Sequence, residues 1–173
     1  MRPICFGLYL VTSVAAAAQG SVTGTLTVNA ASVTLKFATA VAYTNGTDRS
    51  VSVLLSDKPA NAKTFAEYTR IGANERYVPG IFEGAWASLH VEKEFSGFTF
   101  SVDASNKILT NQILVGGENG RFSVSSDDLV LEVTSVSPRF TGRIRSKQPV
   151  LDLGDRKVSL DATFDALVSV AGK

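Results

Sequence analysis

The stretch VSLDATFDALVSV, residues 158–170, alternates apolar and polar side chains along most of its length. Every second residue from Val158 to Val170 is apolar, and most of the residues between them are polar. Because successive side chains of a strand point to opposite faces, this alternation is typical of a strand with one buried face. The stretch therefore predicts a long strand close to the end of the chain.

Shorter segments with the same alternation precede it, separated by clusters of Gly, Asn and Ser. In one of them, Val33, Leu35, Phe37, Thr39 and Val41 are predicted to share one face. The turn signal NG at residues 45–46 follows this segment. Further strands are predicted at residues 51–55, 89–91, 98–102, 113–115, 129–133 and 140–144. This pattern favours an all-β fold, a single antiparallel β-sandwich or flattened barrel.

One interruption has helical character. Residues Pro59 to Gly72 contain the sequence TFAE at 64–67, which has the spacing of a capping box, and Gly72 is a suitable C-terminal stop. We expect one short helix there, packed beside the sheet.

The last two strands are predicted to form a hairpin. A three-residue loop, GDR at 154–156, would place Ile144 opposite Ala166 and Arg145 opposite Asp165. The outward face would then carry arginines beside aspartates, which favours a self-neutralised, solvated surface over an anion-binding stripe. Pro149 lies inside this hairpin and marks the place where the register can fail.

The N-terminal segment has the pattern of a signal peptide. Arg2 is followed by an apolar stretch at residues 4–14 and by four alanines at 15–18. We expect cleavage after Ala18, giving a signal peptide at 1–18 and one β-sandwich domain at 19–173. The apolar stretch is shorter than the roughly 20 residues that cross a bilayer, and no later run is long enough, so no integral membrane segment is expected after processing. The predicted location is periplasmic or secreted.

Composition excludes several classes of function. The chain of 173 residues has 17 basic and 16 acidic side chains, so its net charge of +1 gives no reason to expect a nucleic-acid partner. It has one Cys and one His, which excludes a disulfide framework and a cysteine-rich metal site. Cleavage after Ala18 would also remove the thiol of Cys5, which suits an oxidising compartment. We expect no cofactor and no metal.

The strand predicted at residues 85–92 carries the candidate binding residues. Alternation places on its polar face the side chains of Trp86, Ser88, His90 and Glu92. Residues two apart in a strand are about 7 Å apart, which is too far for Ser88 and His90 to act as a nucleophile and its base. The face could instead stack on a sugar ring or hold a small ligand. The alternative is a tryptophan covered by a neighbouring loop, with His90 at the surface.

The other polar clusters are more typical of turns than of catalytic, metal or phosphate sites. Asp127 and Asp128 are adjacent before a strand, as turn formers often are. Asp152 and Asp155 lack the dense oxygen-ligand spacing of a calcium loop. The GGENG sequence at 116–120 has no Lys-Ser/Thr ending, so a hairpin turn is expected in place of a phosphate loop.

Several short segments resemble a family of small secreted bacterial domains of uncharacterised function. They are TLTVN at 25–29, VTL at 33–35, VLLSDKP at 53–59, TGRI at 141–144 and DATFDA at 161–166. The resemblance spans nearly the whole predicted mature chain, but residues 73–120 depart from it. It implies an all-β exported domain and supplies no catalytic residues.

Three functions are therefore considered. The first is a non-enzymatic exported domain that binds a small molecule or an envelope protein. The second is a glycan or ester hydrolase that uses His90 with a nearby carboxylate, for which Glu83, Glu92 and Glu94 are candidates. The third is a structural or assembly protein of the cell envelope that acts through an exposed edge strand.

Overall fold

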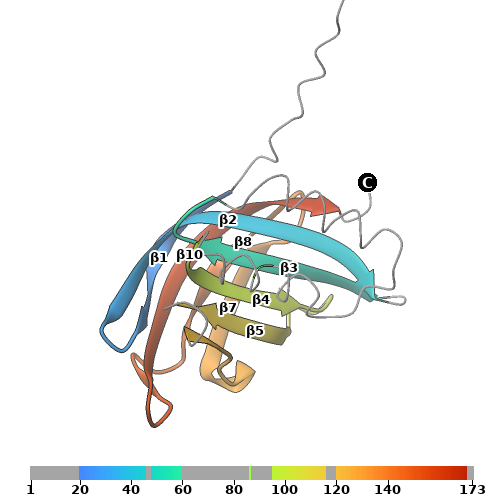
Figure 1. The fold of residues 1–173 in the computed structure, drawn as a ribbon. Helices are drawn as coiled ribbons and strands as arrows, with labels where there is room; N and C mark the ends of the chain where they lie inside the picture. Colours follow the sequence, from blue (N-terminus) through green and yellow to red (C-terminus); the bar gives the residue numbers. More distant parts are fainter. Residues whose placement is uncertain (1–19, 46–47, 60–85, 87–94, 116–119, 171–173) are drawn as a thin grey trace, which may run out of the picture.

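The computed structural model describes residues 20–45, 48–59, 86, 95–115 and 120–170 (Figure 1). This part of the chain contains ten strands and one short 3-10 helix. The elements are β1 (Gly20–Val28), β2 (Ala31–Asn45), β3 (Asp48–Ser56), β4 (Gly97–Val102), β5 (Ile108–Leu114), β6 (Arg121–Phe122), η2 (Ser126–Asp128), β7 (Leu129–Ser135), β8 (Arg139–Ser146), β9 (Leu151–Asp152) and β10 (Lys157–Val170).

The strands form one sheet in the order β6-β5-β4-β3-β2-β1-β10-β8-β7, with β9 paired to β10. The sheet curls so that β10, β8 and β7 lie behind β2 to β5 in Figure 1, but its order ends at β6 and β7, so it is not closed. All pairings are antiparallel except one, in which Val168–Val170 run parallel to Ala40–Ala42. The predicted all-β antiparallel fold is confirmed, and the helix expected after Pro59 falls at residues outside the described part.

The two halves of the curled sheet share one apolar core. Phenylalanine rings cross it, with centroids 5.8 Å apart for Phe98 and Phe100, 5.8 Å for Phe100 and Phe164, and 5.7 Å for Phe164 and Phe140. The Phe100–Phe164 pair has the edge-to-face geometry that aromatic quadrupoles favour. These rings come from β4, β8 and β10, so the core links strands that are not neighbours in the sheet.

Strand β2 changes the face that it turns to the core within its own length. Val33 and Leu35 belong to the core, as predicted. Beyond them the core residues of this strand are Ala38, Ala40 and Ala42. The prediction that Phe37, Thr39 and Val41 continue the face of Val33 is therefore wrong. The pairing of β2 with β1 shifts by one residue at this point, and such an irregularity interrupts strict alternation.

The register of the C-terminal hairpin differs from the prediction by four residues. Ile144 lies opposite Ala162, not Ala166, and Arg145 lies opposite Asp161, not Asp165. Because a shift by an even number keeps every side chain on its own face, the predicted faces of β8 and β10 hold although the partners do not.

The shift has two local causes. The loop has four residues and not three, because Lys157 pairs with Asp152 and the Leu153 N–H donates to the Arg156 carbonyl over 2.8 Å. In addition, β8 ends at Ser146 and β9 begins only at Leu151, so the residues around Pro149 leave the ladder. The register therefore fails where the proline predicted that it could.

The outward face of β7, β8 and β10 is neutralised by ion pairs, as predicted. They are Arg139–Asp165, Arg143–Asp161 and Arg145–Glu132. Arg143 binds both oxygens of Asp161, with distances of 2.8 and 2.6 Å, in the two-pronged geometry that arginine prefers. The hydrogen bond from Arg143 lowers the pKa of Asp161. These arginines are occupied and leave no free anion-binding stripe.

Candidate ligand-binding pocket

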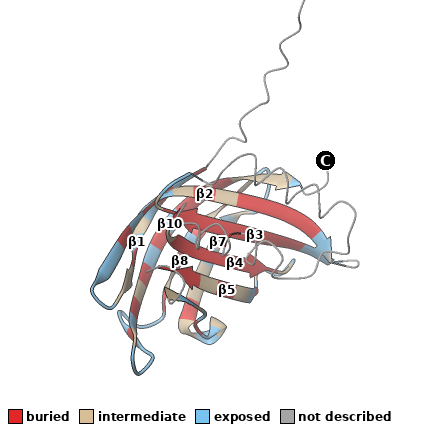
Figure 2. Ribbon diagram, in the orientation of Figure 1, coloured by how far each residue is buried: buried red, intermediate tan, exposed pale blue. Residues whose placement is uncertain are grey.

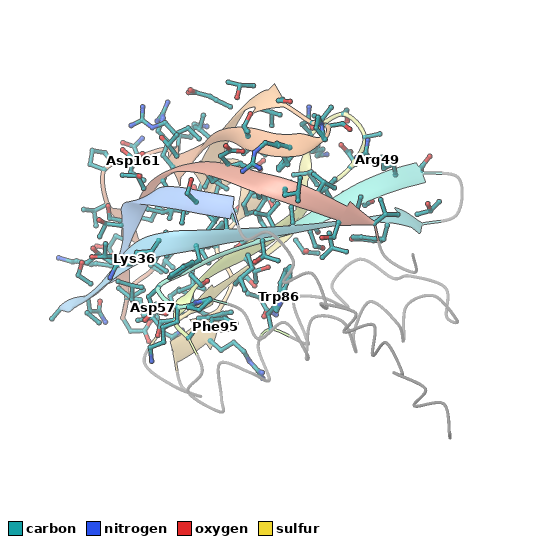
Figure 3. The ribbon with its side chains drawn as sticks, turned by 90° about the horizontal axis from the view of Figure 1, so that it is seen from above. Lys36, Arg49, Asp57, Trp86, Phe95 and Asp161 are labelled. Carbon is teal, nitrogen blue, oxygen red and sulfur yellow. The ribbon has the colours of Figure 1, made fainter. Side chains whose placement is uncertain are left out.

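Trp86 is the one described residue of the predicted binding face. Its side chain is only 2% exposed, and its backbone is helical at that position. Figure 3 shows its indole beside the sheet, on the same side as Phe95. Burial fits a covered tryptophan better than an open stacking platform. Ser88, His90 and Glu92 lie outside the described residues, and their role stays a prediction.

A different hollow combines charge with an apolar floor. It has a volume of about 180 Å³ and is lined by Arg49, Val51, Asp103, Ala104, Asn106, Val136 and Phe140. These residues come from the start of β3, the turn after β4, the connection from β7 to β8 and the start of β8. We call this hollow the mouth pocket, because it lies where the core reaches one end of the curled sheet.

Strand alternation brings Arg49 to the mouth pocket. Val51 and Val53 follow it at two-residue spacing and belong to the core, so Arg49 continues the inward row of β3 at its outer end. Figure 3 shows it near the end of the β2–β3 hairpin. Within the described part of the chain, Arg49 forms no ion pair, whereas four other arginines do. Its guanidinium is therefore free to bind an anion.

The turn between β4 and β5 fixes Asp103 in the wall. Its Oδ1 accepts hydrogen bonds from the Ser105 N–H at 2.9 Å, the Ser105 hydroxyl at 2.7 Å and the Lys107 N–H at 2.9 Å. The Ser105 hydroxyl, and then the Lys107 N–H, lower the pKa of Asp103, so the carboxylate keeps its charge well below neutral pH. The Asn106 N–H donates to the Asp103 carbonyl over 3.1 Å, which holds Asn106 beside it.

The rest of the mouth pocket is apolar. Phe140 and Val51 are buried members of the core and form its floor. Val136 stands at the rim and is 43% exposed. The connection that carries Val136 is tied to β10, because the Val168 N–H donates to the Pro138 carbonyl over 3.1 Å. An apolar floor with a few fixed polar groups is the usual composition of a small-molecule site.

Two of the larger hollows on the described surface lack these features. One, of about 360 Å³, lies over Gly142, and its arginine, Arg143, is already paired with Asp161. The other, of about 350 Å³, follows β5. There the Asn111 amide is occupied, because it donates to the Val124 carbonyl at 2.9 Å and accepts from its N–H at 3.0 Å.

Asp127 and Asp152, which belong to two of the remaining candidate clusters, have structural roles, whereas residues 116–119 of the GGENG sequence lie outside the described part of the chain. Asp127 lies in η2, where its N–H donates to the Ser125 hydroxyl that caps the turn. Asp152 accepts from the Gly154 N–H over 3.0 Å, and Gly154 has a φ of +85°, which glycine adopts without strain. Among the described residues, no group of three or more His, Cys, Asp and Glu side chains could hold a metal ion. Nor does this part of the chain contain a helix with the length and apolarity needed to cross a membrane.

The mouth pocket was not predicted from the sequence, although one feature of the sequence pointed to it. In the row Arg49, Val51, Val53, Leu55, a cation occupies an inward position of an otherwise apolar face. Nothing in the sequence indicated that Asp103 and Val136 would meet it, since they are far apart along the chain. Comparison with known proteins adds no candidate: the chain matches no protein-family model, no curated protein and no solved structure.

Proposed function

We propose that the chain is an exported, non-enzymatic domain that binds a small molecule in the mouth pocket. The observation that carries the proposal is the position of Arg49, which forms no ion pair within the described residues, above a floor made by the core residues Val51 and Phe140. Apolar pockets with a few convergent polar groups, at the mouth of a curled sheet, are common ligand sites.

Export is supported by the signal-peptide pattern of residues 1–18 and by the position of the first strand. β1 begins at Gly20, two residues after the predicted cleavage site. A Cβ at Gly20 would lie 2.0 Å from the Asp165 carbonyl oxygen, so this strand is closely packed from its first residue. We expect the exported protein to begin at Gln19, and mass spectrometry of the protein recovered outside the cytoplasm tests this. An intact N-terminal Met1 on that protein would contradict it.

The other hypotheses carry less support. A hydrolase centred on His90 depends on residues outside the described part of the chain. An assembly role through an edge strand is opposed by the irregular pairing near the end of β7, between Val133 and Ser135, because bulges disfavour strand addition. The proposal of export also draws on the resemblance to small secreted bacterial domains, which implies an all-β fold like the one that this chain has.

A thermal-shift screen tests binding in the mouth pocket. The panel holds sugars, peptidoglycan fragments, carboxylic acids, amines and amino acids. A compound at about 100 times its Kd stabilises the native state by about 2.7 kcal/mol, a shift of roughly 5–10 °C in a domain of this size.

A pair of tryptophan variants locates the binding site. Ala104→Trp should fill the mouth pocket and abolish the shift, because Ala104 is an exposed residue of its wall. Val150→Trp is the matched control, since Val150 is exposed and lies outside that wall. A compound that stabilises the Ala104→Trp variant as strongly as the wild type would contradict the proposal, as would no stabilisation by any compound.

A further inference from the structure

We infer that the mouth pocket takes a small zwitterion, an α-amino acid with a short aliphatic side chain. This inference rests on the proposed function and adds the chemical class of the ligand.

The two charged side chains of the wall are of opposite sign and are not paired with each other. Arg49 and Asp103 both line the mouth pocket, yet no ion pair joins them. A simple anion would be attracted by Arg49 and repelled by Asp103, and a simple cation would meet the reverse. A ligand that carries both charges can satisfy both groups, with its carboxylate on Arg49 and its ammonium on Asp103.

The turn between β4 and β5 orients the Asp103 carboxylate so that it can bind an ammonium group. The hydrogen bonds from Ser105 and Lys107 all reach Oδ1, and they hold the side chain in one orientation. No hydrogen bond or ion pair is formed by Oδ2 within the described residues, so this oxygen remains available to an ammonium group. Asn106, in the same turn, adds an amide that can bond to either end of the ligand.

Size and surface define the rest of the ligand. A cavity of about 150 Å³ accommodates benzene, and the mouth pocket holds about 180 Å³. An occupant of roughly eight or nine non-hydrogen atoms, such as valine or leucine, matches this volume. Its aliphatic side chain would contact Val51, Val136 and Phe140. A sugar would place its hydroxyls against the same apolar residues and leave them without partners.

Three compounds of matched shape test the inference on the wild-type protein, produced from its full sequence. They are L-valine, 3-methylbutanoate, which lacks the ammonium group, and 2-methylpropylamine, which lacks the carboxylate. Isothermal titration calorimetry should show L-valine binding at least tenfold more tightly than either of the others. Equal affinity for L-valine and 3-methylbutanoate would overturn the inference, because Asp103 would then contribute nothing.

Two charge variants assign the ends of the ligand. Arg49→Gln should weaken both L-valine and 3-methylbutanoate by at least tenfold. Asp103→Asn keeps an oxygen acceptor for the turn, and it should weaken L-valine while strengthening 3-methylbutanoate. Arg121→Gln is the control, because Arg121 is an exposed arginine outside the pocket and should change neither affinity. Loss of L-valine binding in Arg121→Gln as well would count against the assignment.

The outcome separates the inference from the proposed function. If L-valine does not bind but another compound does, and Ala104→Trp abolishes that binding, the zwitterion is wrong and the mouth pocket remains a binding site. If no compound binds in the pocket, both the zwitterion inference and the proposed function are contradicted.

Discussion

The outer surface of β3 and β4 and the outer surface of β8 and β10 belong to one sheet and back the same core, yet they differ in burial. Ser52, on β3, and Ser101 and Thr99, on β4, are 0% exposed. On β8 and β10, the outward residues Arg143 and Asp161 are exposed. Figure 2 shows β3 and β4 buried along nearly their whole length, whereas parts of β1 and β10 are exposed.

The two surfaces satisfy their polar groups in different ways. On the buried surface, the Thr99 hydroxyl donates to the Val53 carbonyl over 2.9 Å, and the Ser101 and Thr110 hydroxyls are hydrogen bonded at 2.6 Å. Small neutral groups with partners can be buried at little cost, whereas charges cannot. The exposed surface carries ion pairs, which water tolerates. Burial, and not strand type, therefore determines which polar residues each surface uses.

The buried surface also has its own link to the segment between β3 and β4. The Asp57 N–H donates to the Ser96 carbonyl over 3.0 Å, and the Ser96 N–H donates to Asp57 Oδ1 over 2.7 Å. These bonds hold the two ends of that segment together. Trp86 and Phe95, the buried aromatic residues described within it, both lie against this half of the molecule (Figure 3).

The largest effect is expected when a charge is placed on the buried surface. Ser101→Asp should lower the free energy of unfolding by several kcal/mol or prevent folding, because the carboxylate would be buried without a cation. The same change at Thr34, on the exposed surface of β2, should stay within about 0.5 kcal/mol. Urea denaturation of both variants measures the difference. Equal effects would mean that Ser101 is no more buried than Thr34.

The next largest effect is expected at Trp86. Trp86→Ala should cost about 3–5 kcal/mol of stability, because it removes a large buried side chain and leaves a cavity. Leu109→Ala is the control, since Leu109 is 40% exposed and should lose less than about 1 kcal/mol. If Trp86→Ala unfolded at the same urea concentration as the wild type, the tryptophan would have to be exposed, as a stacking platform requires.

A smaller effect is expected where β1 approaches β10. A Cβ at Gly24 would lie 2.2 Å from the Asp161 carbonyl oxygen, so Gly24→Ala forces the two strands apart. The expected loss is roughly 1–3 kcal/mol in thermal or urea denaturation. An unchanged midpoint would show that the spacing of β1 and β10 is looser than described.

The smallest effect is expected from the ion pairs of the exposed surface. The pKa of Asp161 is lower in the folded state than in the unfolded state, so the unfolded chain takes up the proton first as the pH falls. The pair with Arg143 therefore contributes stability above the ordinary aspartate pKa of about 3.9 and loses it as the pH falls through the lowered value. Asp161→Asn should be slightly less stable than the wild type at pH 7 and equal to it at the acid end. A constant difference across that range would contradict the pair.

The two-residue spacing of apolar side chains was enough to predict the all-β fold. The predictions failed where that spacing does not distinguish the two faces of a strand. The alternation of β10 identified its buried face correctly, because its polar and apolar residues separate cleanly. In the later part of β2, residues 37–43, both rows are largely apolar, so alternation could not reveal that the core face passes from Leu35 to Ala38. The hairpin faces were correct and its partners were wrong, because the four-residue loop and the excursion at Pro149 together shift the register by an even number of residues, which leaves the faces unchanged.

The candidate site was less predictable than the fold for a physical reason. Arg49 and Asp103 are brought together by the pairing of Val51 with Val102, which joins strands separated by a long segment. Periodicity describes each strand by itself and does not identify its neighbours. The sequence predicted a binding face at residues 85–92 because Trp86 and three polar side chains occupy every second position there, and a pattern within one segment is visible in the sequence.

The most direct test of binding in the mouth pocket is a ¹H–¹⁵N NMR titration of the protein with the ligand that stabilises it most. Binding in the mouth pocket should change the chemical shifts of the Arg49 Nε–H, the Asn106 side-chain amide and the backbone amides of Val51 and Val136, with the Trp86 indole N–H unchanged. Changes centred on the Trp86 indole, with Arg49 and Asn106 unaffected, would contradict it and return the site to the tryptophan.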